Sequence, residues 1–298
     1  MSAPTLPTTV TAPDAPTGST RTVVPAGSAE PGGLPVTPLR LTVVQARAVP
    51  GQVATNSRRA ADGALRAARR GARLIVLPEL HVGGYHLPGV PAAAVPADDA
   101  GAVTDHRLAP LAEVAATRRV TVLVGAAVRH PDGRLTNSVL VADPTGIRVG
   151  YDKQHLWQDE ATVFTRGRSA GTLTVDGWRI GLGVCYDMSF PEHARASALA
   201  GGHVYLAASA FAAGTEHRAG VYLAARALEN TVYTAFVNPV GGPPERPCRG
   251  GSALWGPDGR RLGVRRGDRE GMLSHDLDPA ELARVRGFLR MLAQVRAG

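Results

Sequence analysis

The sequence predicts an α/β domain in which helices cover mixed β-sheets, and three observations favour this class. Short apolar strands alternate with longer helical segments along the chain, a pattern typical of layered α/β architectures. Asp-Gly turns such as Asp132-Gly133 join neighbouring strands into hairpins, which adds antiparallel pairing. With 298 residues and a hydrophobic content of 44 %, the chain is long enough to bury a sizeable core.

The N-terminal segment differs in composition from the rest of the chain. Residues 1–38 are rich in Pro, Thr, Ala and Gly and contain almost no large apolar side chains. Such a segment cannot bury enough surface to offset the entropy of ordering, so we predict a disordered tail. The folded domain is expected to occupy residues 39–298 and to end in a helix.

The elements of the first half follow from apolar runs and turn residues. A turn at Asp132-Gly133 separates two strands of a hairpin, and Pro78 ends a buried strand. The predicted elements are strand 41–44, helix 52–70, strand 74–77, helix 101–119, strands 120–128 and 135–141, and a strand that ends near Tyr151.

The second half continues the same alternation. A helix is expected to begin at Pro191, because proline suits the first position of a helix. The predicted elements are strands 171–176 and 178–184, strand 204–208, helix 216–230, strand 232–238, a hairpin around 257–259 and a helix from Pro279. That last helix is predicted to present one apolar face, made of Leu282, Val285, Leu289, Leu292 and Val295.

The net charge of +8 raises nucleic-acid binding as a possible function. The arginines, however, are scattered in pairs such as Arg58/Arg59 and do not form a basic tract. Only 5 % of the residues are aromatic, so stacking platforms for bases would be sparse. We therefore predict no nucleic-acid partner, and a salt-dependent binding titration would test that prediction.

The location is predicted from what the sequence lacks. No apolar run reaches the roughly 18 residues that a membrane helix needs, and the first 20 residues contain neither a basic region nor an apolar core typical of a secretory signal. The two cysteines, Cys185 and Cys248, make no disulfide framework. A cytoplasmic protein with no membrane partner is predicted.

Cys185 is a candidate nucleophile. It ends the glycine-spaced apolar run 180–184 and precedes a short polar turn and the helix expected at Pro191. A thiol at such a corner is expected to be exposed, to have a pKa lowered by a helix end or a cation, and to lie beside backbone N–H groups that receive an oxyanion. The alternative is a small hydrophobic residue that packs at a strand end.

Glu79 is a candidate general base. It follows the apolar strand 74–77 and Pro78, so we expect it at the rim of a sheet, half desolvated, with a raised pKa. A solvated loop glutamate is the alternative interpretation.

Lys153 is the only lysine among 33 basic residues, and it ends another predicted strand. A position that retained lysine against 32 arginines suggests a need for a compact point charge, although codon bias could also explain it. Glu160, seven residues later, could hold the ammonium by a charge-assisted hydrogen bond or could be a surface partner worth about 0–1 kcal/mol.

Together these segments resemble the carbon–nitrogen hydrolases of the nitrilase superfamily, from the amidase and carbamoylase branches. The matching motifs are Leu77-Pro78-Glu79-Leu80 with Gly84-Tyr85, Tyr151-x-Lys153-x-His155-Leu156 with Glu160, and Cys185-Tyr186-Asp187 with Phe190-Pro191-Glu192. The resemblance covers roughly residues 39 to 290, and the three ordered motifs make it specific.

The resemblance implies a four-layer α-β-β-α sandwich that pairs into homodimers or higher homo-oligomers. It implies that a small linear amide is hydrolysed through a cysteine thioester, with Glu79, Lys153, Cys185 and Glu160 as catalytic residues. Glu79 would carry the protons, Lys153 and the Tyr186 backbone N–H would stabilise the oxyanion, and Glu160 would orient Lys153 and the substrate nitrogen. No metal or organic cofactor is expected.

The substrate is left open. Tyr85, Tyr186 and Arg218 are the expected substrate-binding residues, and Arg218 stands where many relatives carry tryptophan, so we hypothesise that it pairs with a substrate carboxylate. An N-carbamoyl amine or N-carbamoyl amino acid hydrolase is the alternative reaction, and a non-catalytic binding scaffold is the alternative of another class. No role is assigned to Cys248.

Overall fold

The computed structural model describes residues 33–297 except residue 245, and the first 32 residues of the predicted tail lie outside this part. Within it, the first strand of the chain lies next to the last strand, which forms one edge of the first sheet. Its strands run in the order β15-β1-β2-β4-β5-β6, and β3 pairs with β4 beside this path. They are β1 (Leu39–Gln45), β2 (Leu74–Val76), β3 (Val95–Pro96), β4 (Thr121–Arg129), β5 (Leu135–Asp143), β6 (Gly146–Asp152) and β15 (Gly271–Leu277).

The second sheet has the order β14-β13-β10-β9-β8-β7. Strands β8, β9 and β10 of this sheet pair in parallel, whereas its outer pairs are antiparallel. The first sheet also contains parallel and antiparallel pairs, so both sheets are mixed. They are β7 (Gly171–Val175), β8 (Trp178–Val184), β9 (Val204–Ala208), β10 (Tyr233–Val237), β13 (Ala253–Trp255) and β14 (Arg261–Val264); a separate two-stranded sheet joins β11 (Val240–Gly241) and β12 (Cys248–Arg249).

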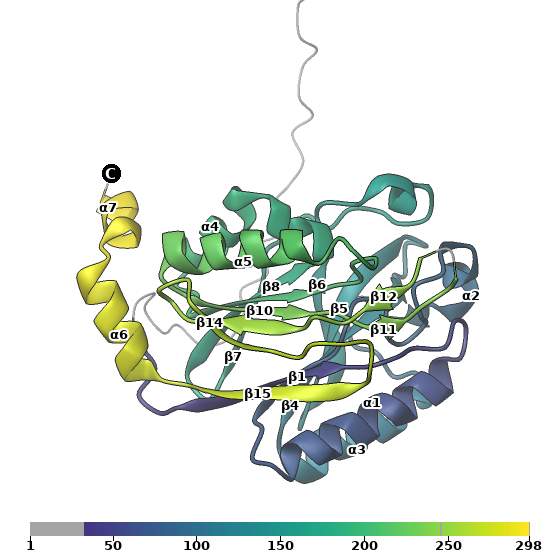
Figure 1. Cartoon of the computed structure of the whole chain (residues 1–298). Helices are drawn as coiled ribbons and strands as arrows, with labels where there is room; N and C mark the ends of the chain where they lie inside the picture. Colours follow the sequence, from purple (N-terminus) through teal and green to yellow (C-terminus); the bar gives the residue numbers. More distant parts are fainter. Residues whose placement is uncertain (1–32, 245, 298) are drawn as a thin grey trace, which may run out of the picture. The chain divides into compact units, whose positions relative to one another are not determined.

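Helices cover the outer face of each sheet (Figure 1). Helices α1 and α3 pack on the first sheet, and α4 and α5 pack on the second. The helices are α1 (Val53–Ala68), α2 (Val90–Ala93), α3 (Ala109–Arg118), α4 (Pro191–Leu199), α5 (His217–Asn230), α6 (Pro279–Phe288) and α7 (Met291–Ala297), with 3-10 turns η1 (Leu87–Gly89), η2 (His106–Leu108), η3 (Gln158–Thr162) and η4 (Cys185–Ser189). The predicted α-β-β-α sandwich is confirmed.

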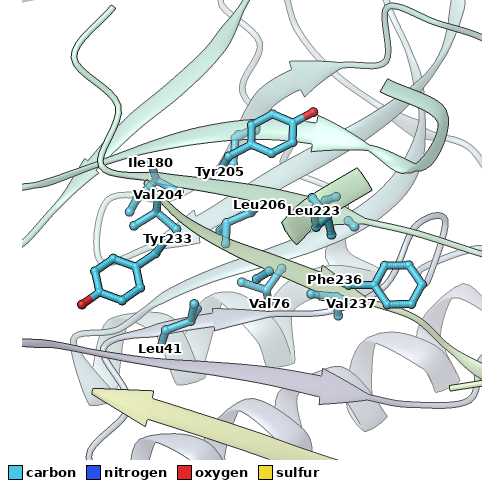
Figure 2. Close-up of a cluster of buried hydrophobic side chains, with 14 of the residues drawn as sticks. Leu41, Val76, Ile180, Val204, Tyr205, Leu206, Leu223, Tyr233, Phe236 and Val237 are labelled. Carbon is cyan, nitrogen blue, oxygen red and sulfur yellow. The ribbon is translucent and has the colours of Figure 1, made fainter. Parts of the chain in front are cut away.

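Side-chain alternation along the first sheet produces these layers. Leu74 and Val76 of β2 point into the core between the sheets, whereas Ile75 and Leu77 belong to the core under α1 and α3. Because every second residue faces the other way and both faces are covered, the strand is apolar throughout. Figure 2 shows the inter-sheet core, where Leu41 and Val76 lie opposite Ile180 and Leu206 of the second sheet.

Three sequence predictions need correction. The helix predicted for 101–119 is reduced to η2 and α3, because Pro110 starts the α-helix at its second position and the preceding residues form a bridge to β6. The C-terminal helix predicted from Pro279 is interrupted at Leu289, whose backbone is extended, so α6 and α7 are separate. Val295 is therefore 51 % exposed and does not continue the apolar face of Leu282 and Val285. Strand β15 was not predicted.

The residues just before β1 contact the core. The indole N–H of Trp178 donates to the Thr37 carbonyl at 2.8 Å, so contacts with the core begin before Leu39. Among residues 33–297, apart from 245, none of the helices has the length and apolar character needed to cross a membrane.

Candidate active site

Three strand ends from two different sheets bring the predicted catalytic residues together. Glu79 follows β2 and Lys153 directly follows β6, both in the first sheet, whereas Cys185 directly follows β8 in the second sheet. Glu160 lies in η3, a 3-10 turn that approaches from the loop after β6. The site therefore lies where the ends of the two sheets meet, and neither sheet alone could form it.

Gly125 of β4 makes room for the segment that carries Glu79. A Cβ atom at this position would collide with the backbone of Pro78, Glu79 and Leu80. The close approach allows the Gly125 N–H to donate to the Pro78 carbonyl at 3.1 Å, and Leu80 adopts a φ of 49° to turn the chain away. Backbone contacts, and not loop flexibility, thus fix the direction in which Glu79 points.

Lys153 lies between two carboxylates. Its Nζ donates to Glu79 Oε1 at 2.7 Å and lies 2.8 Å from Glu160 Oε2. The side chains of all three residues are fully shielded from solvent. The alternatives of a solvated Glu79 and a surface pair for Glu160 are therefore excluded, and Glu79 is more buried than the half-desolvated position that we expected.

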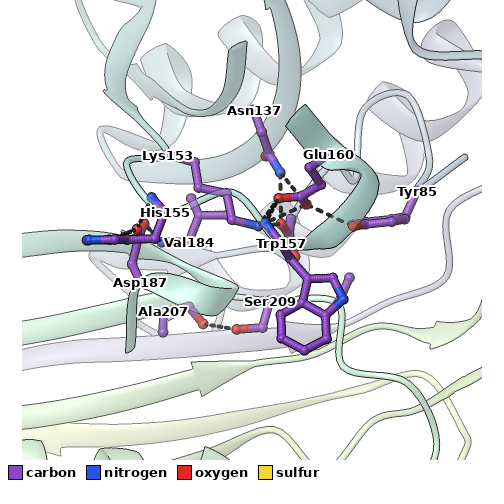
Figure 3. A network of polar contacts seen from close by, with 12 residues as sticks. Tyr85, Asn137, Lys153, His155, Trp157, Glu160, Val184, Asp187, Ala207 and Ser209 are labelled. Atoms are coloured by element: carbon purple, nitrogen blue, oxygen red, sulfur yellow. Dashed lines mark hydrogen bonds and ion pairs between the residues drawn. The ribbon is translucent and has the colours of Figure 1, made fainter. Parts of the chain in front are cut away.

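Neutral donors complete this cluster (Figure 3). The Asn137 amide donates to Glu79 Oε1 at 2.8 Å, and the Tyr85 hydroxyl donates to Glu160 Oε1 at 2.8 Å. The Trp157 backbone N–H donates to Glu160 Oε2, also at 2.8 Å. Glu79 Oε2 has no hydrogen-bond partner among the described residues. One oxygen of Glu79 is thus held in place, and the other is free to accept a proton.

The electrostatics of the cluster follow from its burial. Loss of solvent raises the pKa of Glu79, and the attraction of Lys153 offsets only part of that rise. Burial alone would lower the pKa of Lys153, but Glu79, Cys185 and Glu160 raise it well above its usual value. Lys153 is therefore a cation, and the raised pKa of Glu79 has the direction expected from the sequence.

Cys185 differs from its prediction in two respects. Its side chain is buried, not exposed, because the η4 turn folds back over the end of β8. Burial and the negative charge of Glu79 raise the thiol pKa well above its usual value, and Lys153 lowers it only in part. The resting residue is therefore a thiol, and a thiolate forms only when a base takes the proton.

The turn that carries Cys185 is held from both sides. Cys185 itself has a left-handed φ of 47°, a conformation that costs free energy in a residue other than glycine. Asp187 accepts the Val184 backbone N–H at 2.9 Å, and buried Arg226 of α5 donates to the Met188 carbonyl at 3.2 Å. These contacts hold the strained turn and fix the position of the sulfur.

A pocket of about 220 Å³ opens over Cys185. Its wall includes the rings of Trp157 and Tyr186, which meet edge to face at 4.9 Å. The Arg218 guanidinium lies 5.5 Å from the Phe211 ring centroid and 5.9 Å from that of Trp157, so Arg218 faces the pocket. The pocket is lined by Trp157, Gln158, Cys185, Tyr186, Ser189, Ala210, Phe211, Ala212, Thr215, Arg218, Tyr222 and Arg246.

The three predicted substrate-binding residues occupy different places. Tyr186 and Arg218 line the pocket over Cys185, whereas Tyr85 lies outside its lining and holds Glu160. Sequence reasoning missed Arg246, which lines the pocket and stacks over Tyr85 at 4.2 Å. One arginine in a proline-rich loop carries no periodic or spacing signal. Sequence reasoning also did not identify Asn137, which donates to Glu79.

Comparisons with known proteins agree with this geometry. The model of the family described as carbon-nitrogen hydrolase matches residues 40–287. The chain belongs to this family. Its relatives include a protein of Pseudomonas protegens named "Hydrolase in pqqF 5'region", which is 33 % identical over 91 % of this chain and 95 % of its own length. An (R)-stereoselective amidase of Pseudomonas sp is 34 % identical over 71 % of this chain and 76 % of its own length.

A solved structure supports the same assignment. The amidase of Nesterenkonia sp. AN1, from the nitrilase superfamily, superposes with a TM-score of 0.71 at 30 % identity, covering 85 % of this chain and 98 % of that one. Another structure of that amidase shows acrylamide added at its active site cysteine. The chain is thus an amidase-like hydrolase of carbon–nitrogen bonds other than peptide bonds, and the predicted amide hydrolysis through a cysteine thioester is confirmed.

Proposed function

We propose that Cys185 attacks the amide carbon, that Glu79 moves the protons and that Lys153 and the Tyr186 backbone N–H stabilise the oxyanion. The observation that carries this proposal is the buried ion cluster, in which one ammonium lies between Glu79 and Glu160 at 2.7 and 2.8 Å. Two carboxylates and one ammonium leave an excess negative charge, so the cluster favours uptake of a proton at Glu79.

The steps balance with the amide and one water molecule as the reactants. The thiol proton of Cys185 passes to Glu79, the sulfur bonds to the amide carbon, and the carbonyl oxygen becomes an oxyanion beside Lys153. Glu79 then gives the proton to the leaving nitrogen, the carbon–nitrogen bond breaks, and a thioester remains. Water loses a proton to Glu79 and attacks the thioester, after which Glu79 returns the proton to the departing sulfur. Glu160 keeps Lys153 in position throughout.

The substrate class that we propose is a small linear amide with a carboxylate at the end opposite to the amide. Support comes from Arg218 and Arg246, two guanidinium groups in the wall of a pocket otherwise rich in aromatic rings. Guanidinium groups bind carboxylates through paired hydrogen bonds. A 2-oxoglutaramate amidase of Bacillus subtilis, 30 % identical over 76 % of this chain and 85 % of its own length, is named for a substrate of this kind.

Succinamate and butyramide test this proposal, because both have four carbons and only the first has a carboxylate. We expect ammonia release from succinamate to be the faster, and Cys185→Ala to release none from either. Arg218→Ala should lower kcat/KM for succinamate about tenfold or more and leave butyramide within about twofold. Arg166→Ala, an exposed arginine outside the pocket, is the matched control. An equal loss on both amides would remove the carboxylate role of Arg218.

The same assay distinguishes the alternative reaction. N-carbamoyl-β-alanine also has a carboxylate, but its hydrolysis releases carbon dioxide together with ammonia. Preference for this compound over succinamate, with carbon dioxide as a product, would replace the amidase proposal by the carbamoylase one.

We also propose a homodimer that forms through the helical layer on the second sheet. Helix α5 presents Val221 and Leu228 seven residues apart, hence on one face, and Val221 is 67 % exposed. An apolar face of this kind is typical of an interface. Sedimentation velocity of the wild type and of Val221→Glu measures the assembly. A cytoplasmic location, supported by two free cysteines, is checked by cell fractionation.

A further inference from the structure

A second, smaller cavity lies next to Glu79 and is not the pocket over Cys185. Its volume is about 30 Å³, against about 220 Å³ for the pocket. Cys185 does not line it, whereas Glu79, His81 and Cys248 do. The full lining is Ala48, Pro50, Pro78, Glu79, His81, Tyr85, Ala210, Pro239, Val240, Gly242, Pro243, Arg246 and Cys248.

This cavity runs from the surface to the buried base. Pro50 and Gly242 in its wall are exposed, whereas Glu79 and His81 are buried. Its volume leaves room for about two water molecules and excludes an amide substrate. The cavity can therefore conduct water from solvent to Glu79, but not a larger ligand.

Polar atoms without partners lie at its inner end. Glu79 Oε2 and both ring nitrogens of His81 have no hydrogen-bond partner among the described residues. Burial lowers the pKa of His81 to about 4, so near neutral pH its ring offers one donor and one acceptor. Buried polar groups of this kind are usually satisfied by ordered water, since leaving them unsatisfied costs about 1–3 kcal/mol each.

Arg246 and Ala210 line both the cavity and the substrate pocket, so the two spaces adjoin at these residues. The Arg246 guanidinium donates to the Ala210 carbonyl at 3.2 Å and stacks over Tyr85 at 4.2 Å. An acyl group held on Cys185 would occupy the pocket on one side of these two residues. The cavity on the other side would remain accessible to solvent.

We propose that this cavity is a water-binding site, with His81 as its anchor, that supplies the water for thioester hydrolysis to Glu79 from the side opposite to the substrate. The proposal rests on the proposed function, because it assigns the source of the second reactant in that mechanism. The water loses one proton to Glu79, its oxygen bonds to the acyl carbon, and the carbon–sulfur bond breaks. Glu79 then gives the proton to the sulfur of Cys185, so that the acid and the free thiol are the products.

Two variants close the site in different ways. Ala48→Leu fills the cavity from its wall, and His81→Phe removes both nitrogens that would hold the water. Ala112→Leu, a half-exposed alanine of α3 that lines neither cavity, is the matched control. Rapid-quench assays with succinamate and butyramide measure the first release of ammonia, and the mass of the quenched protein measures the thioester.

We expect both cavity variants to release the first ammonia at the wild-type rate and to lose about tenfold or more in acid formation, with thioester accumulating. Ala112→Leu should behave as the wild type. Where one variant does not fold, the other still measures thioester hydrolysis.

Two results would overturn the proposal: wild-type thioester hydrolysis in both variants, or a slower first release of ammonia without thioester accumulation. Absence of Cys185-dependent ammonia release in the wild type is a different result. It would overturn the proposed function, and the wild-type control alone reveals it.

Discussion

Two buried polar clusters lie at the ends of the strands, and they differ in how completely their charges are satisfied. In the cluster around Lys153, this residue is shared between two carboxylates and Glu79 Oε2 has no partner among the described residues. In the other cluster, Asp187 accepts four hydrogen bonds, two from His155 and one each from Tyr151 and Val184, at 2.7–2.9 Å. The carboxylates of Glu79 and Asp187 are both buried, but Asp187 accepts hydrogen bonds from more donors.

This difference decides the properties of the two carboxylates. Burial raises the pKa of Glu79, whereas for Asp187 the bonds from His155, Val184 and Tyr151 outweigh burial and lower the pKa. An under-satisfied carboxylate accepts a proton readily and suits a base. A fully satisfied one stays ionised and holds the structure around it, here the loop of Lys153 and the turn of Cys185.

The largest effect is expected for Lys153→Met, which removes the ammonium that lies between Glu79 and Glu160. Two carboxylates would then be buried without their counter-charge, and we expect a loss of about 3–5 kcal/mol in the free energy of unfolding together with loss of turnover. Urea unfolding and ammonia release measure both. Unchanged stability would mean that the two carboxylates do not depend on Lys153.

Glu79→Gln tests the free oxygen. Glutamine retains the shape but cannot carry protons, so turnover should fall about 10²–10⁴-fold. The ionised form of Glu79 contributes little to the stability of the folded protein. The free energy of unfolding of the variant should therefore not be lower than that of the wild type. Glu113→Gln, an exposed glutamate of α3, is the control for removal of one negative charge. A large loss of stability in Glu79→Gln would contradict the contrast between the two clusters.

Asp187→Asn is expected to show the opposite balance. An amide cannot accept all four hydrogen bonds, and each buried donor left unpaired costs about 1–3 kcal/mol. We expect lower stability and a decrease in kcat with little change in KM, because Lys153 and Cys185 would shift relative to each other. Unfolding in urea and steady-state kinetics measure the split between kcat and KM. A rise in KM alone would indicate that Asp187 acts on substrate binding.

The smallest effect concerns pH. The folded pKa of Asp187 lies below its ordinary value of 3.8, so its stabilising contribution is present above that pH and disappears as the pH falls through the folded pKa. The stability difference between wild type and Asp187→Asn should therefore be full at pH 6 and shrink below about pH 4. Glu79 has a raised pKa, so the difference for Glu79→Gln should not shrink in that range.

The sequence predicted the parts of the site that follow apolar strands. Glu79, Lys153 and Cys185 each lie just after the end of a predicted strand, and a polar residue at a strand end is visible without a structure. Their burial was not predicted, because it depends on turns that fold over them, and the expected exposure and lowered pKa of Cys185 were therefore wrong.

The missed features depend on partners that are distant in sequence. Strand β15 lacks a clear apolar alternation, and its partner β1 begins at Leu39, more than 200 residues earlier. Arg246 reaches the site only because its loop folds back onto Tyr85.

The break at Leu289 falls within a continuous apolar pattern, so periodicity alone predicts an uninterrupted helix there.

The pairing of β15 with β1 also sets an order on synthesis. Seven residue pairs join these strands, from Leu39 with Leu277 to Gln45 with Gly271. While the chain emerges from the ribosome, β1 and β2 are complete long before β15 exists, so one edge of β1 has no partner for almost the whole of translation. An unpaired strand edge is a template for association between chains. A nascent chain that stalls before residue 271 would carry Glu79, Lys153 and Cys185 and still present an open sheet to its neighbours.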